Sequence, residues 1–138
     1  MKSVLLKGKS LLEDTARLGT AVETAVFKHH NVRHFRTSGT LSWWRGGCGE
    51  HEVDFVEESP DGLMPFEVKC TQEMVQNSDL KGMAIVCGER KFKLGCIITR
   101  DMGDIGLLAL PVNGGKKSEE VRIPALLACW WLSQSQIA

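Results

Sequence analysis

The hydrophobic positions of this chain recur with a helical period near its start and with a strand period soon afterwards. In residues 11–30, apolar side chains return every three or four positions, which predicts an amphipathic helix. They are Leu11, Leu18, Val22 and Val26. Ser10 and Glu13 have the S-x-x-E spacing by which a hydroxyl and a carboxylate bond the free N–H groups of a helix start. We therefore expect this helix to begin near Leu11.

Three strands are predicted next. Residues 40–45 are rich in β-formers and end at two glycines, and residues 51–58 alternate between apolar and polar side chains. The sequence Ser-Pro-Asp-Gly over residues 59–62 is typical of a turn, and residues 63–70 return as another extended segment. The second and third strands therefore form a predicted hairpin.

Alternation assigns the side chains of this hairpin to two faces. In the second strand, Val53 and Phe55 are expected on one face, and Glu52 and Asp54 on the other. In the third strand, one face is apolar and the other charged. The apolar face carries Phe66, Val68 and Cys70, and the charged face carries Glu67 and Lys69.

The second half of the chain has a different pattern. Residues 77–93 repeat apolar side chains at helical intervals and end on basic residues, which predicts a second helix. Residues 94–99 and 105–110 are continuous apolar runs, typical of strands covered on both faces, so we expect both in the middle of the sheet. A polar loop over residues 113–118 precedes Pro124, where a final helix is predicted to begin.

The order of these elements predicts an α/β sandwich with a mixed central sheet of about five strands flanked by helices. The length suits a single domain over residues 1–138, with residues 1–10 as an N-terminal extension. Seventeen basic and seventeen acidic side chains cancel, which excludes an acidic disordered tail and a uniformly basic nucleic-acid coat. No apolar run is long enough to span a membrane, and the first residues are charged too soon for a signal peptide, so we expect a cytoplasmic protein with no membrane partner.

The candidate chemistry lies in the predicted hairpin. If residues 59–62 close it, the register places Asp54 opposite Glu67. Carboxylates that face one another across a strand pair repel, so this pair needs a compensating cation. Lys69 lies two residues further along, and a hard divalent ion held by oxygen atoms compensates more fully than one ammonium. The hairpin therefore predicts a magnesium or manganese site.

Two further groups complete this candidate site. The carbonyl of Val68 adds an oxygen ligand for the metal. Glu23 lies at the margin of the apolar stripe of the first helix, and Gly19, which has no side chain, is expected to let this helix approach the sheet. In one interpretation, Glu23 then points towards Asp54 and joins the site. In the other, which is equally supported, Glu23 is only a solvated side chain at the margin of the helix.

Together these residues suit phosphodiester hydrolysis. Asp54 and Glu67 anchor a metal ion that acidifies a bound water, and Lys69 orients the nucleophile or stabilises the charge growing on the phosphate. The alternative is that these Glu and Lys side chains form only solvated cross-strand pairs.

The charge around the hairpin is unevenly distributed. Residues 28–49 contain three histidines, no acid and four Lys or Arg, whereas residues 50–61 contain six acids and no Lys or Arg. The four are Lys28, Arg33, Arg36 and Arg45. One interpretation is a basic rim that binds phosphate beside the acidic site. The other is a solvated loop whose charges attract the next segment.

Neither the cysteines nor the histidines predict a zinc site. The five cysteines lie far apart without a C-x-x-C pair, which also argues against a disulfide framework. His29, His30 and His34 have no cysteine or acid at ligand spacing beside them, so we interpret them as surface histidines.

Four tryptophans occur in two adjacent pairs. Trp43 and Trp44 point to opposite faces of a strand, so one is expected in the core and the other is free to stack on a base or a partner. Trp130 and Trp131 are expected to close the core; the alternative is an exposed docking face.

A helix with Glu23, a strand with Asp54 and a strand with Glu67 and Lys69 in E-x-K spacing resemble the PD-(D/E)XK nuclease superfamily. A closer likeness is to the uncharacterised nuclease-like domain that follows the ATPase module in many prokaryotic AAA-type ATPases. The residues that carry it are 19–23, 44–45, 52–56, 67–69 and 123–124, within about residues 18–132. The resemblance implies a restriction-endonuclease-like fold and a DNA-directed role.

The sequence hypothesis is thus metal-dependent hydrolysis of DNA, with Asp54, Glu67, Lys69 and Glu23 as catalytic residues. The alternative is a non-catalytic DNA-binding or protein-docking module accessory to an AAA-type ATPase. The expected partners are DNA, an ATPase module or another protein and, as in many nucleases of this fold, a second copy of the chain. ATP binding is not expected, because residues 8–10 lack the earlier glycine of a phosphate loop.

Overall fold

The structure, a computed structural model, describes residues 13–35, 39–47, 49–60, 62–89, 92 and 94–134. The predicted extension over residues 1–10 lies outside these residues. The helices are α1 (Thr15–His34), the short 3₁₀ helix η2 (Asn77–Leu80), α2 (Lys81–Glu89) and α3 (Ala125–Ser133). The strands are β1 (Thr40–Arg45), β2 (Glu52–Ser59), β3 (Gly62–Lys69), β4 (Gly95–Thr99), β5 (Gly106–Pro111) and β6 (Lys117–Pro124).

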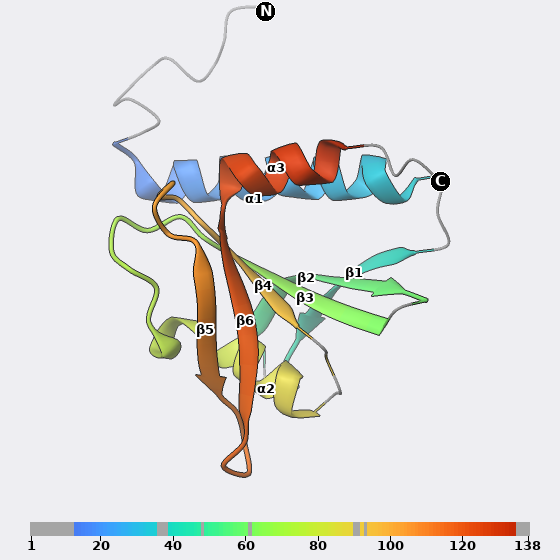
Figure 1. Ribbon diagram of the computed structural model, residues 1–138, viewed down its shortest axis with the longest axis vertical. Coiled ribbons are helices and arrows are strands. Elements are labelled where there is room, and N and C mark those ends of the chain that lie inside the picture. The colour runs from blue at the N-terminus through green and yellow to red at the C-terminus, as the bar shows by residue number, and fades with distance from the viewer. Residues whose placement is uncertain are drawn as a thin grey trace, which may run out of the picture.

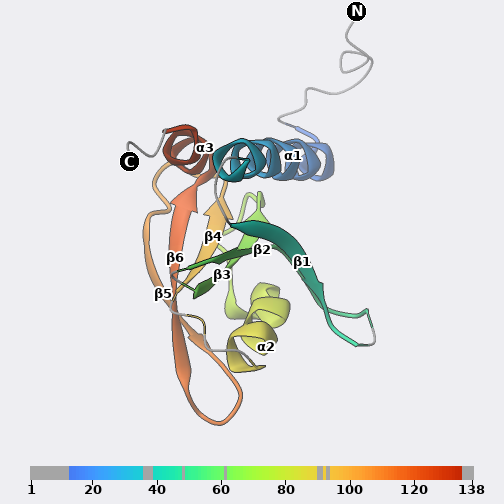
Figure 2. The ribbon, with the colours of Figure 1, turned by 90° about the vertical axis from the view of Figure 1, so that its right-hand side faces the viewer.

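These strands form one mixed sheet in the order β1-β2-β3-β4-β6-β5. The β3–β4 and β4–β6 pairs are parallel and the other three pairs are antiparallel. Helices α1 and α3 lie side by side over one face, and α2 covers the other (Figures 1 and 2). Each face has its own apolar core, and the predicted mixed α/β architecture is confirmed. It is compatible with a restriction-endonuclease-like fold.

Helix α1 begins and ends later than predicted. Asp14 is its N-cap, and its Oδ1 accepts a hydrogen bond from the N–H of Arg17 at 3.2 Å. Glu13 lies in a turn before the helix, so the predicted capping role of Glu13 is wrong; Ser10 and Leu11 lie outside the described residues. Residues 31–34 contain no glycine or proline to end the helix, so it continues for one more turn to His34.

The hairpin of β2 and β3 has the predicted register near its turn. The pairs run from Ser59 opposite Gly62 to Phe55 opposite Phe66, one residue short of Asp54 and Glu67. On its other side, β2 is irregular: β1 advances two residues while β2 advances three. The extra residue of β2 is a β-bulge that lies between residues 53 and 56 and therefore includes Asp54.

The bulge changes which side chains share a face. Val53 packs in the core on the α2 side, with Met83 and Val86. Phe55 packs in the core on the α1 and α3 side, with Val26. The prediction that Val53 and Phe55 share a face is therefore wrong, because regular alternation fails where a strand carries an extra residue.

In the described part of the chain, the sheet has six strands rather than about five. Strand β6 was missed because its sequence is rich in charge, although the strand lies inside the sheet between β4 and β5. Its Glu120 is fully buried, and Oε1 accepts a hydrogen bond from the thiol of Cys87 at 3.5 Å. A buried carboxylate breaks the apolar pattern by which interior strands are recognised.

The two apolar runs have different positions in the sheet. Strand β4 is buried along its whole length, as predicted. Strand β5 is an edge strand that alternates in exposure, so its predicted place in the middle of the sheet is wrong. Leu107 of β5 is 63% exposed. Apolar composition alone therefore did not distinguish an edge strand from an interior one.

The second predicted helix is shorter than expected. It divides into η2 and α2, and Phe92 is not helical; residues 90, 91 and 93 lie outside the described residues. Helix α3 follows Pro124, as predicted, but Trp130 and Trp131 are exposed, and Ala128 and Leu132 pack in the core instead. In the described part of the chain, no helix combines the length and hydropathy needed to cross a membrane.

Of the first tryptophan pair, Trp44 packs against the core and Trp43 is 77% exposed, as the opposite-face prediction requires. Four cysteines are described, and all four are free thiols that are buried or half-buried. They are Cys70, Cys87, Cys96 and Cys129.

Candidate active site

A cavity of about 430 Å³ opens where α1, β2, β3 and the start of α2 meet. Its lining includes every residue that the sequence predicts for the catalytic and metal site. These are Glu23, Asp54, Glu67, Val68 and Lys69. The structure thus places one helix residue and four hairpin residues around a common space, which we call the carboxylate cavity.

Two short contacts organise the centre of this cavity. The Nζ atom of Lys69 lies 2.7 Å from Oε1 of Glu67. The N–H of Val68 donates a hydrogen bond to Oδ2 of Asp54 at 2.7 Å, which ties the bulged part of β2 to β3. The bulge thereby directs Asp54 into the cavity, a common function of bulges beside active sites.

Burial perturbs the ionisation of this group. Desolvation, followed by the charge of Asp54, raises the pKa of Glu67 to about 7, although Lys69 opposes the rise. Desolvation also raises the pKa of Asp54, opposed by its hydrogen bond from Val68 and by Lys69. Burial alone would lower the pKa of Lys69, but Glu67 and Asp54 outweigh it, so the pKa is raised and the ammonium stays charged.

Glu23 lies in the cavity for a reason other than the predicted one. Desolvation and then the charge of Asp54 raise the pKa of Glu23, so the two carboxylates are close enough to interact. A Cβ atom added to Gly19 would meet no atom within 4 Å. The prediction that Gly19 permits close packing of α1 is therefore wrong, although Glu23 does line the cavity.

A close contact between main chains forms the part of the cavity wall at the start of α2. Gly82 lies so near the main chain of Glu52 that a Cβ atom would overlap the carbonyl group. Asp79 also lines the cavity, while its Oδ2 accepts a hydrogen bond from the N–H of Gln76 at 2.9 Å. Sequence reasoning missed this wall, although a glycine within an apolar helix was a usable signal.

The predicted basic rim does not line the carboxylate cavity among the residues that the structure describes. Arg45 lies 2.9 Å from Glu52, and His34 lies 3.2 Å from Glu57. Arg33 donates to the carbonyl of Trp131 and packs over its ring. Arg36 lies outside the described residues. Arg45 and His34 instead fit the second interpretation, in which the basic segment is attracted to the acidic segment that follows it, because both pair with glutamates of β2.

The residues around the cavity fit a hard divalent cation. Oε2 of Glu67 is buried and makes no hydrogen bond to any described residue. Carboxylate oxygens from two neighbouring strands, with a main-chain carbonyl between Glu67 and Lys69, are the donors that magnesium and manganese prefer. The buried oxygen of Glu67 lacks a partner that such an ion would provide.

The fold and this cavity define an α/β protein with a carboxylate-rich site at the bulged end of a hairpin. The chain belongs to the family described as "Domain of unknown function (DUF4143)", which matches residues 18–113. The match includes all five predicted site residues and ends between β5 and β6. No curated protein matches the chain.

Proposed function

We propose that this protein is a metal-dependent phosphodiesterase that cleaves DNA, with the PD-(D/E)XK arrangement of catalytic residues. The observation that carries the proposal is the contact of Glu67 with Lys69 in the cavity that Asp54 and Glu23 also line. The second carboxylate oxygen of Glu67 is buried without a hydrogen bond among the described residues, as a metal-ligand atom would be before the ion binds.

The residues of the carboxylate cavity have different roles in this proposal. Asp54 and Glu67, with the carbonyl of Val68, would hold magnesium or manganese. Such an ion supplies an acidified water and neutralises the charge on the phosphate. Lys69 remains protonated, because its pKa is raised, so it acts as an electrostatic group and not as a general base. Its ammonium is placed to orient the attacking water or to stabilise the phosphorane-like charge.

Glu23 has an auxiliary role in this proposal. It belongs to α1, whereas the other groups belong to the hairpin, so it approaches the cavity from a separate element. Glu23 is exposed, unlike Glu67. A solvent-exposed carboxylate at this position can accept a hydrogen bond from a metal-bound water without holding the ion itself.

The second candidate is a non-catalytic DNA-binding or protein-docking module accessory to an AAA-type ATPase, and one observation favours its protein-docking form. Among the described residues, six carboxylate side chains and two lysines line the cavity. A phosphate would be repelled there unless a divalent ion were bound first. Metal binding is therefore the property that separates the two candidates.

The test is cleavage of supercoiled and linear DNA with magnesium or manganese. We expect wild-type protein to cleave and Lys69→Met to lower the rate by roughly 10²- to 10³-fold, the cost of losing one group that stabilises transition-state charge. Asp54→Asn should also lose manganese binding, measured by calorimetry. Folding of each variant is checked by circular dichroism.

Matched controls come from the same elements. Lys28→Met changes an exposed lysine of α1, and Glu58→Gln changes an exposed carboxylate of β2; neither residue lines the cavity. Both should cleave like wild type. Absence of cleavage by wild type with both metals would favour the accessory module, and equal rates in Lys69→Met and wild type would contradict the assigned chemistry.

A further inference from the structure

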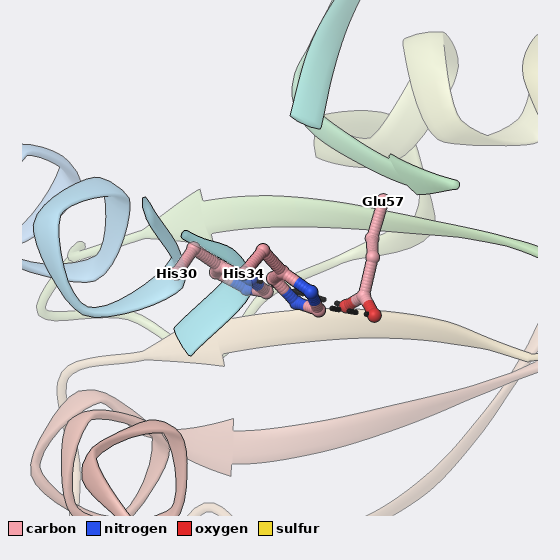
Figure 3. A group of neighbouring side chains, drawn as sticks. All are labelled: His30, His34 and Glu57. Atoms are coloured by element: carbon pink, nitrogen blue, oxygen red, sulfur yellow. Dashed lines mark ion pairs between the residues drawn. The ribbon is translucent and has the colours of Figure 1, made fainter. Parts of the chain in front are cut away.

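A second polar cluster joins α1 to β2, separate from the carboxylate cavity. His30 and His34 are four residues apart in α1, so their side chains lie on the same face of the helix. Glu57 projects from β2 towards both imidazole rings (Figure 3). None of the three residues lines the carboxylate cavity. We call this group the histidine cluster.

The donor atoms of the histidine cluster converge. Oε1 of Glu57 lies 3.2 Å from Nε2 of His34, and Oε2 of Glu57 lies 3.9 Å from Nδ1 of His30 (Figure 3). One ligand atom from each residue lies within 4.8 Å of the others. Donors at about 2.0–2.1 Å from a tetrahedral zinc ion are roughly 3.3 Å apart. The donor atoms of the cluster are therefore close to the spacing of zinc ligands.

His30 carries the strongest signal in this cluster. Its residue surface is 0% exposed, so its interpretation as a surface histidine is wrong. Neither ring nitrogen has a hydrogen-bond partner among the described residues. Burial, followed by the charges of His34 and Arg33, lowers the pKa of His30 to about 4. A buried imidazole without a polar partner is costly unless a ligand completes it.

The surroundings hold the cluster in place and leave one side accessible. The ring of His30 packs edge-on against Phe66, with centroids 4.3 Å apart, and stacks with His34 at 5.9 Å. A Cβ atom at Gly39 would lie 2.9 Å from Nδ1 of His34, so glycine leaves the room that this ring occupies. The side chains of His34 and Glu57 retain 11% and 16% exposure, so an ion reaches the cluster past these two residues.

We propose that His30, His34 and Glu57 bind a zinc ion that links the last turns of α1 to β2. Two imidazoles and one carboxylate are an established donor set for zinc, with a water or another group at the fourth position. Imidazole nitrogen disfavours magnesium and calcium, and zinc binds such sites more tightly than iron(II) or manganese. The proposal is independent of the phosphodiesterase proposal, because it uses different residues and a different class of metal.

The test is calorimetric titration of the full chain with zinc as the only titrant, in a buffer that contains excess magnesium to compete for the carboxylate cavity. We expect wild type to bind one zinc ion. Glu57→Gln and His34→Gln should weaken binding by more than the roughly 10- to 100-fold that changes outside the ligand shell cost. These two residues are chosen because replacement of the fully buried His30 risks unfolding.

The matched controls are neighbours that are not in the cluster. His29→Gln removes an adjacent histidine, and Glu58→Gln removes the next carboxylate of β2; both should bind zinc like wild type. Cobalt(II) gives a second readout, because a four-coordinate site has a visible absorption band that Glu57→Gln should abolish. No zinc binding by wild type, or unchanged affinity in both Glu57→Gln and His34→Gln, would overturn the proposal.

Discussion

The carboxylate cavity and the histidine cluster both take side chains from α1 and β2, yet their chemistry differs. The cavity takes Glu23 from α1 and Asp54 from β2, and the cluster takes His30 from α1 and Glu57 from β2. The bulge in β2 lies between Val53 and Val56, so Asp54 falls within it and Glu57 just beyond it. One irregular residue thus allows a single helix–strand pair to present two distinct polar groups.

The two regions also respond to pH in opposite directions. Glu67 has a pKa raised to about 7 by burial, so between pH 4.5 and 7 the folded protein holds a proton that the unfolded chain has released. Its contribution to stability therefore falls as pH rises. His30 has a pKa lowered to about 4, so between pH 4 and 6.5 the unfolded chain holds the extra proton. Its contribution therefore rises with pH over nearly the same range.

The largest expected change in stability comes from a substitution at Glu67, which removes the pH dependence that Glu67 gives the carboxylate cavity and leaves that of His30. Glu67→Gln removes the cost of a buried charge, so the metal-free variant should be more stable than wild type at pH 8, by up to about 3 kcal/mol at ~1.4 kcal/mol per pKa unit. The difference should be near zero at pH 4.5, grow up to pH 7 and then stay constant. Urea unfolding at several pH values, with a chelator present, measures it.

Glu58→Gln is the control for this comparison, because Glu58 is an exposed carboxylate of the same strand. Its free energy of unfolding should follow that of wild type at every pH. If Glu67→Gln instead proved less stable than wild type at pH 8, the ion pair with Lys69 would outweigh the cost of burial, and the opposition between the two regions would not hold.

A smaller effect compares the glycines that border the two regions. Gly82→Ala should destabilise the protein by about 2 kcal/mol, because its Cβ would overlap the main chain of Glu52. Gly39→Ala should cost no more than about 1 kcal/mol, because its tightest neighbour is the ring of His34, a side chain that can rotate. Thermal and urea unfolding of both variants test this order.

Gly88→Ala serves as the control near the exposed end of α2. A Cβ atom there would meet only ordinary contacts of 3.6 Å or more, so the helix preference of alanine should leave stability unchanged or raise it by up to about 1 kcal/mol. Equal costs at Gly82 and Gly39 would mean that the wall of the cavity is as adaptable as the histidine cluster.

The smallest effect concerns Arg33, between the two histidines in sequence. Its Nη1 donates to the carbonyls of Trp131 and Gln134, and its guanidinium lies 4.9 Å from the ring centroid of Trp131. Arg33→Gln should therefore cost about 1 kcal/mol of stability. Because Arg33 joins α1 to α3 and does not line the carboxylate cavity, the substitution should leave unchanged any DNA affinity that the proposed function requires.

Lys28→Gln is the corresponding control on α1, since Lys28 is exposed and forms no ion pair with another described residue. Its stability should match wild type. A loss of DNA affinity in Arg33→Gln, measured by fluorescence anisotropy at fixed salt, would restore the basic-rim interpretation that the structure does not support for Arg33.

The sequence by itself determined the hairpin and most of the carboxylate cavity. The turn residues after Ser59 and the alternation in β3 are local signals, so the register near the turn and the joint position of Glu67 and Lys69 follow from neighbouring residues alone. The same local patterns located α1, β1, β4 and the start of α3 to within a few residues.

Only the tertiary structure decided where distant residues meet. The bulge in β2 is defined by its pairing with β1. Strand β6 lies between β4 and β5, where the fold buries its Glu120 completely, which the sequence of β6 does not indicate. The spacing of His30 and His34 was visible in the sequence, but Glu57 joins them only when α1 packs across the sheet. Such contacts depend on how whole elements pack, and no period within a single segment records them.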